Sequence, residues 1–203
     1  MTTTTPRFAG AFTALITPFR NGEVDEQALR RLVDFQIEGG VTGVIPCGTT
    51  GESVTLTEFE HDRVIEIVIE QAAGRVPVIA GTGTNNPRLT IERTRHAREI
   101  GADAALLVVP YYNKPTQEGM IRHFTMIAEA TDLPLILYNV PGRTGVNMTP
   151  ETVARLSEIP TIVGIKEASG NLDQVSQIVG SVRSDFVVLS GDDSLTLPIM
   201  SVG

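Results

Sequence analysis

The stretch that decides the fold is TIVGIKEASG, residues 161–170. Its β-branched residues form a continuous apolar run, which is typical of a parallel strand buried on both faces. Lys166 stands inside this run, although the chain has only one other lysine, Lys114, against 14 arginines. An arginine stays protonated in proteins, whereas a desolvated lysine can lose its proton and attack a carbonyl carbon. The stretch therefore predicts a parallel sheet and a reactive amine within it.

Apolar segments of the same kind recur at nearly even spacing, and helical patterns with readable caps lie between them. One such cap is the T-x-x-E capping box of Thr57 and Glu60. Repeated strand–helix units predict either a doubly wound sheet or a (β/α)₈ barrel. The segments are GAFTALITP (10–18), GVIPCG (43–48), VPVIAG (76–81), AALLVVP (104–110), LPLILYNVP (133–141), TIVGIKEAS (161–169) and FVVLSGDD (186–193).

The barrel is favoured over the doubly wound sheet. A dinucleotide-binding sheet would need G-x-G-x-x-G after its first strand, but TPFRNG (17–22) stands there. Even spacing and polar residues at the ends of several strands are typical of a barrel. Because these segments number seven rather than eight, we expect residues 1–203 to form a barrel domain that lacks its eighth strand.

Composition excludes several classes of partner. The net charge of −8 and pI near 4.9 argue against nucleic acid and anionic membranes, and no apolar run approaches the ~18 residues of a membrane span. The single cysteine, Cys47, excludes an internal disulfide and is expected to be a small buried residue. The N-terminus lacks a signal-peptide pattern, so we expect a cytoplasmic protein. The three histidines show no metal-binding spacing, so no metal is expected.

Reactive side chains follow four of the predicted strands, at the end where barrels build their sites. An amine, a phenol, a guanidinium and paired hydroxyls suit imine chemistry on an α-keto acid. The stretches are CGTTGES (47–53) with Thr49 and Thr50, PYYNKP (110–115) with Tyr111 and Tyr112, YNVPGRTG (138–145) with Tyr138 and Arg143, and IKEASG with Lys166.

Each of these groups also has a plain structural alternative. Lys166 could pair with a buried carboxylate, Tyr138 could be a core residue with a satisfied hydroxyl, and Arg143 could be a solvated loop residue. Asp192 and Asp193 could serve metal or acid–base chemistry, although capping of the following helix is the favoured interpretation.

Five motifs in chain order resemble the dihydrodipicolinate synthase family of pyruvate-dependent class I aldolases: GTTGES, PYYNKPTQEG, YNVPGRTG, GIKEASGNL and LSGDD. The resemblance implies a lyase without a cofactor that condenses pyruvate with L-aspartate 4-semialdehyde. The product would be 4-hydroxy-tetrahydrodipicolinate, on the diaminopimelate route to lysine. A sister aldolase acting on keto-deoxy sugar acids, or an inactive chain that only binds a keto acid, are the alternatives.

The resemblance also implies residue roles. Lys166 forms the Schiff base with pyruvate, and Tyr138 is the proton donor and acceptor. Tyr138 is linked through Thr49 to Tyr112 in a proton relay.

Substrate contacts are implied in the same way. Thr50 holds the pyruvate carboxylate, Arg143 holds the carboxylate of the aldehyde, and Gly191 lies near the keto-acid site. The family implies a homotetramer, a dimer of dimers, in which Tyr112 reaches into the partner's site.

Overall fold

The computed structural model describes residues 8–203, and the chain divides into two compact units. The N-terminal unit comprises Gly10–Thr82 and Glu92–Leu106. The C-terminal unit comprises Gly83–Ile91 and Leu107–Gly203, with the short segment before Gly10. Helix α3 (Pro87–Glu99) and strand β6 (Ala104–Val108) each contribute residues to both units.

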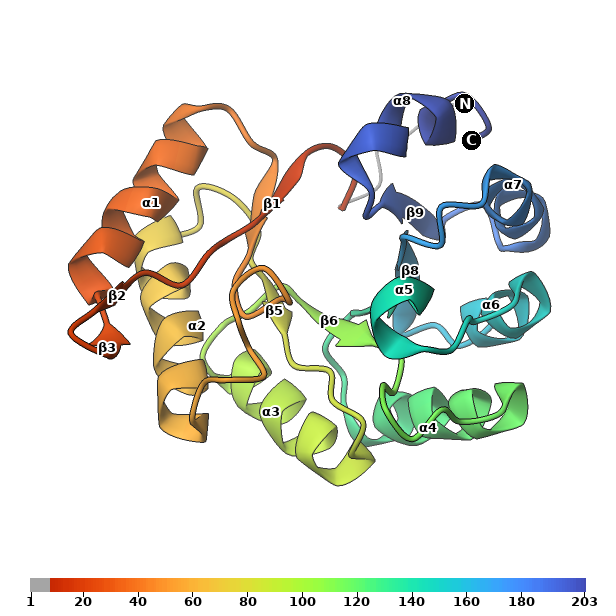
Figure 1. Cartoon of the computed structure of the whole chain (residues 1–203), viewed down its shortest axis with the longest axis horizontal. Coiled ribbons are helices and arrows are strands. Elements are labelled where there is room, and N and C mark those ends of the chain that lie inside the picture. The colour runs from red at the N-terminus through yellow and green to blue at the C-terminus, as the bar shows by residue number, and fades with distance from the viewer. Residues whose placement is uncertain (1–7) are drawn as a thin grey trace. The chain divides into compact units, whose positions relative to one another are not determined.

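Parallel strands and two long helices build the N-terminal unit. Strand β1 pairs with β4 and β5 pairs with β6, both in parallel, and an isolated parallel bridge joins Val44 to Val78. Helices α1 and α2 lie side by side (Figure 1), where Arg63 on α2 donates two hydrogen bonds of 2.8 Å to the carboxylate of Glu26 on α1. The bounds are β1 Phe12–Ala14, β2 Phe19–Arg20, β3 Glu23–Val24, α1 Glu26–Glu38, β4 Gly43–Ile45, α2 Glu58–Ala72 and β5 Ile79–Gly81.

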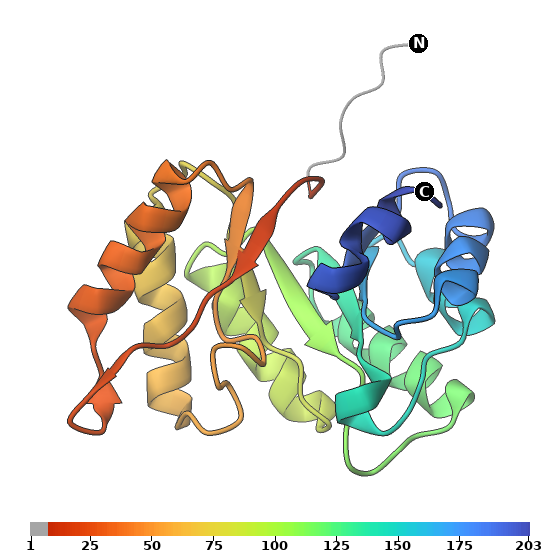
Figure 2. The same ribbon diagram turned by 45° about the horizontal axis from the view of Figure 1, so that its top comes forward.

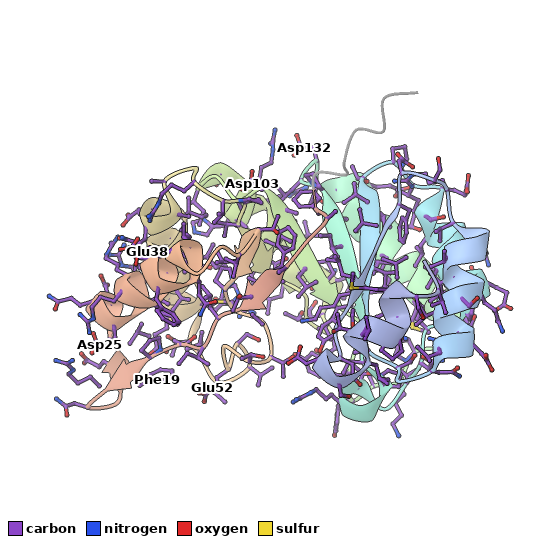
Figure 3. The ribbon with its side chains drawn as sticks, turned by 90° about the horizontal axis from the view of Figure 1, so that it is seen from above. Phe19, Asp25, Glu38, Glu52, Asp103 and Asp132 are labelled. Atoms are coloured by element: carbon purple, nitrogen blue, oxygen red, sulfur yellow. The ribbon has the colours of Figure 1, made fainter. Side chains whose placement is uncertain are left out.

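A small hairpin between β1 and α1 was not predicted from the sequence. Strands β2 and β3 pair in antiparallel fashion around a turn in which Asn21 and Gly22 both have positive φ, 54° and 88°. The Asp25 carboxylate then caps α1 by accepting a hydrogen bond from the backbone N–H of Ala28. Figure 3 shows Phe19 and Asp25 near one end of α1 and Glu38 at the other. The missed signal is the Asn-Gly pair, which favours tight hairpin turns.

Three parallel strands and the helices packed on them build the C-terminal unit. The strand order is β7-β8-β9, and the side chains of Leu135, Ile136, Leu137 and Ile165 in β7 and β8 are completely buried. Helices α4, α6 and α7 lie next to one another along these strands (Figures 1 and 2). The bounds are α4 Gln117–Ala130, β7 Leu135–Asn139, α5 Pro141–Thr144, α6 Pro150–Ser157, β8 Ile162–Glu167, α7 Leu172–Ser181, β9 Val187–Ser190, the 3₁₀ helix η1 Asp193–Leu195 and α8 Thr196–Met200.

The structure confirms the predicted α/β class. All seven predicted apolar segments contain a parallel strand of the described residues 8–203. The capping box of Thr57 and Glu60 is present as predicted, with both reciprocal hydrogen bonds. Of the helices that the structure describes, none has the length and apolar character needed to cross a membrane.

Candidate active site

Tyr138 and Lys166 stand opposite each other on neighbouring parallel strands. The register of β7 and β8 pairs Tyr138 with Lys166, so both side chains leave the sheet on the same face. Nζ of Lys166 lies 4.7 Å from the centroid of the Tyr138 ring, within the range of a cation–π contact. Tyr138 is 7% exposed and Lys166 is half-buried. The predicted proximity of the two groups is confirmed.

The surroundings of Lys166 favour its neutral form. Burial lowers the pKa of the ammonium below its ordinary value, because desolvation penalises the charged state. The carboxylate of Asp193 opposes this shift, and the guanidinium of Arg143 adds to it. A lysine with a lowered pKa presents more free amine near neutral pH, which is the form that attacks a carbonyl.

Gly191 lies directly against the reactive lysine. Its backbone N–H donates a 2.8 Å hydrogen bond to the carbonyl of Glu167, one residue beyond Lys166. A Cβ atom at position 191 would stand 3.0 Å from both Cε of Lys166 and Cβ of Ala168. Glycine at this position therefore leaves the lysine side chain its space, and any larger residue would displace it.

Arg143 reaches the same region from a short helix. Helix α5 begins at Pro141, immediately after β7, and ends at Gly145, whose φ of 75° suits glycine. The hydroxyl of Thr144 closes this turn by donating to the carbonyl of Val140 at 3.2 Å. Arg143 is exposed, and its positive charge contributes to the lowered pKa of Lys166.

Tyr112 occupies an exposed loop between β6 and α4. Its side chain is 89% exposed, and its φ of 71° is unusual for a residue other than glycine. A large exposed aromatic ring is typical of a surface that meets a partner. The proton relay from Tyr138 through Thr49 to Tyr112 stays a prediction. Lys114, two residues on, is exposed as expected for a solvated loop lysine.

Thr49 and Thr50 belong to the N-terminal unit, in the turn that follows β4. Both are exposed, and the turn is fixed from beneath by Thr17, whose hydroxyl donates a 2.7 Å hydrogen bond to the carbonyl of Gly51. Cys47 precedes the turn, buried and with a φ of 53°. Burial raises the pKa of its thiol to about 12, so the interpretation of Cys47 as an inert buried residue is supported.

The two aspartates after β9 have different roles. Asp192 caps η1, since its carboxylate accepts hydrogen bonds from the backbone N–H and the hydroxyl of Ser194 at 3.1 Å and 2.7 Å. That confirms the capping interpretation for Asp192. Asp193 instead acts electrostatically on Lys166, which sequence reasoning missed. Its signal was the position two residues after Gly191, just beyond the end of the neighbouring strand β9.

Two of the three histidines meet at one carboxylate, because Nδ1 of His61 and Nε2 of His96 lie 3.2 Å and 3.8 Å from the oxygens of Asp62. His61, His96 and His123 lie on α2, α3 and α4 respectively. Across residues 8–203, no three histidine, cysteine, aspartate or glutamate side chains are grouped as a metal ion would require.

A half-buried lysine of lowered pKa beside a tyrosine, at the carboxyl ends of neighbouring parallel strands of an α/β protein, is an arrangement typical of imine chemistry. The chain belongs to the Dihydrodipicolinate synthetase family, which it matches over residues 7–203.

Similar proteins extend this result. The 4-hydroxy-tetrahydrodipicolinate synthase of Nitratidesulfovibrio vulgaris (strain DSM 19637 / Miyazaki F) is 60% identical over 198 residues, which are 97% of this chain and 68% of that protein. The crystal structure of dihydrodipicolinate synthase from Aquifex aeolicus is 52% identical with a TM-score of 0.95, covering 97% of this chain and 67% of that one.

One solved relative is a complex with pyruvate. The chloride-inhibited dihydrodipicolinate synthase from Acinetobacter baumannii, complexed with pyruvate, is 49% identical with a TM-score of 0.93, covering 96% of this chain and 67% of that one. These similarities confirm the predicted (β/α)₈-barrel class. This chain spans about two thirds of the length of these solved relatives.

Proposed function

We propose that this chain catalyses the condensation of pyruvate with L-aspartate 4-semialdehyde to 4-hydroxy-tetrahydrodipicolinate through a Schiff base on Lys166. The observation that carries the proposal is the Lys166 amine, with its lowered pKa, 4.7 Å from the ring centroid of Tyr138. Membership of the family and 60% identity to a named synthase support the choice of substrates.

The first half of the reaction activates pyruvate. The neutral amine of Lys166 attacks the ketone carbon, and the resulting carbinolamine loses water to give an imine. Loss of a proton from the methyl group converts the imine to an enamine. We assign the delivery and removal of these protons to the phenol hydroxyl of Tyr138, a residue whose ring lies beside the amine.

The second half forms the new carbon–carbon bond. The enamine carbon attacks the aldehyde carbon, and the aldehyde oxygen takes up a proton. The amino group of the second substrate then attacks the imine carbon, closes the ring and displaces Lys166 as the free amine. Arg143 supplies a planar cation for the carboxylate of this substrate, Thr50 holds the pyruvate carboxylate, and Thr49 and Tyr112 extend the proton relay.

Oligomeric assembly belongs to the same proposal. The 89% exposed ring of Tyr112, in a loop beside the proposed site, agrees with a partner contact there, and the family implies a homotetramer, a dimer of dimers, for the full-length protein. Sedimentation velocity on the full-length protein would give a tetramer's mass if this is right, and a monomer's or a dimer's mass if it is wrong.

Borohydride trapping tests the chemistry. The protein is incubated with pyruvate, reduced and digested, and the adduct is mapped by mass. We expect one adduct, on the peptide that contains Lys166; a folded chain without an adduct would contradict the proposal. A condensation assay with L-aspartate 4-semialdehyde, set against a sugar aldehyde, then separates the synthase from a keto-deoxy-sugar aldolase.

A further inference from the structure

Two buried polar residues directly follow the reactive pair. Asn139 comes after Tyr138 and Glu167 after Lys166, and the strand register pairs Asn139 with Glu167. Both side chains are completely buried, on the face of the sheet opposite to Tyr138 and Lys166. A fully buried carboxylate is costly unless it is well hydrogen-bonded, so this position calls for a physical reason.

The hydrogen bonds of Glu167 and Asn139 join the two strand ends. Oε1 of Glu167 accepts from the backbone N–H of Ser169 at 2.7 Å, and Oε2 accepts from Nδ2 of Asn139 at 3.0 Å. Oδ1 of Asn139 in turn accepts from the backbone N–H of Met148 at 3.0 Å. The segment after β8 and the segment leading into α6 are thus attached to the same two side chains.

The network continues to the helices. Nδ2 of Asn139 also donates to Oδ1 of Asn147 at 2.8 Å, and Nδ2 of Asn147 donates to Oε1 of Gln174 on α7 at 2.7 Å. Gln117 on α4 donates from Nε2 to the carbonyl of Asn147 at 2.8 Å. The carboxyl ends of β7 and β8 are therefore linked to α7 and to α4 through these hydrogen bonds.

The backbone of Glu167 completes the arrangement on the reactive side. Its carbonyl accepts the N–H of Gly191, the residue packed against the Lys166 side chain. The carbonyl of Asn139 accepts the N–H of Ala168 at 2.9 Å. Any shift of Glu167 would thus move Lys166 and the Gly191 backbone that confines it.

We propose that Glu167 and Asn139 are positioning residues for imine formation, which hold Lys166 and Tyr138 in register through the hydrogen-bond network on the opposite face of β7 and β8. The inference rests on the proposed function, since it concerns the rate at which Lys166 reacts with a keto acid. A purely structural role would change stability and leave this rate unaltered per folded molecule.

The test compares variants by the rate of borohydride-trapped adduct at saturating pyruvate, together with their urea unfolding. Glu167→Gln keeps the size of the side chain but replaces one acceptor oxygen by an NH₂ donor. That donor must face either the Asn139 amide or the Ser169 N–H, and both of these groups are donors themselves. The double variant Asn139→Asp/Glu167→Gln restores one carboxylate facing one amide and keeps the charge of the pair. The bond from Asn139 to Asn147 is then replaced if the amides of Asn147 and Gln174 turn by 180°, so that Asn147 donates to the carboxylate at position 139. Thr131→Val is the matched control, because it removes a buried 2.9 Å hydrogen bond to the Ile127 carbonyl at the end of α4.

We expect Glu167→Gln to slow trapping about 100-fold in the folded protein, because small displacements of a reacting group carry penalties of this size. The control should lose stability while trapping at the rate of the unaltered chain, and the double variant should recover most of the lost rate. If Glu167→Gln does not fold, Glu167→Asp, which keeps the charge and shortens the reach, takes its place with the same expectation.

Two results would overturn the inference in different ways. Trapping by Glu167→Gln within threefold of the unaltered chain would show that the network serves stability alone. A slow Glu167→Gln without recovery in the double variant would show that the pairing of Asn139 with Glu167 is not what positions the lysine. Failure of the unaltered chain to trap pyruvate at all would instead count against the proposed function.

Discussion

On the two faces of the β7–β8 pair, consecutive residues meet opposite surroundings. On one face, Nζ of Lys166 lies over the Tyr138 ring, and burial lowers the pKa of the lysine. On the other face, the carboxylate of Glu167 accepts hydrogen bonds at 2.7 Å and 3.0 Å from Ser169 and Asn139. A reactive amine needs surroundings that disfavour its charged state, whereas an anchoring carboxylate needs surroundings that satisfy its charge with hydrogen bonds.

The sharpest contrast between the faces should come from Lys166→Met. Without an amine no imine can form, so condensation and trapping should fall at least about 1000-fold, below detection. Removal of a half-buried ammonium should leave the free energy of unfolding unchanged or raise it by about 1 kcal/mol. A steady-state assay measures the loss of activity, and urea unfolding measures the change in the free energy of unfolding. A clear loss of stability in Lys166→Met would contradict the contrast between the two faces.

Tyr138→Phe tests the second member of the reactive face. The ring remains, but the hydroxyl that exchanges protons is lost, so turnover should fall about 100-fold to 10,000-fold. An adduct on Lys166 should still accumulate on prolonged incubation with pyruvate and borohydride. Normal turnover would exclude Tyr138 as the proton donor and acceptor.

Glu167→Leu is the corresponding change on the anchoring face. It leaves the Asn139 amide and the Ser169 N–H without their acceptor, and each unsatisfied buried group costs about 1–3 kcal/mol. We therefore expect the urea midpoint to fall far more than for Lys166→Met. Equal stability of the two variants would remove the distinction between the faces.

The smallest effect is expected from Asp193→Asn. The Asp193 carboxylate raises the pKa of Lys166 against the effect of burial, so removing its charge should lower that pKa further. Below the pKa the fraction of free amine then increases, and the trapping rate against pH should move toward lower pH. Because Asp193 is exposed, the gain at a fixed pH should stay below about threefold. A shift to higher pH would show that the carboxylate does not act on the lysine.

Sequence reasoning predicted the elements well where one physical signal dominated. The apolar runs located all seven parallel strands of residues 8–203, because strands covered on both faces are apolar along most of their length. The hairpin of β2 and β3 was missed because it is short and its residues are largely exposed, so no apolar run marks it.

The sequence predicted the candidate catalytic residues of the site, but not the buried residues that hydrogen-bond behind them. Lys166 and Tyr138 stood out because their types are unusual at the ends of apolar strands. Asn139 and Glu167 escaped attention although they are the next residues in the same motifs. Their importance lies in burial and in partners up to 28 positions away along the chain, such as the Asn139–Glu167 bond itself.

By itself the sequence determined the parallel α/β class, the reactive lysine and the family, because these depend on residue type, order and local spacing. Only the tertiary structure decided that the Lys166 amine lies over the Tyr138 ring, that Gly191 leaves room for it, and that Glu167 is bound to Asn139 on the opposite face. The physical reason is that strand register and burial are set by contacts between distant segments. Those contacts also shift the pKa of the lysine.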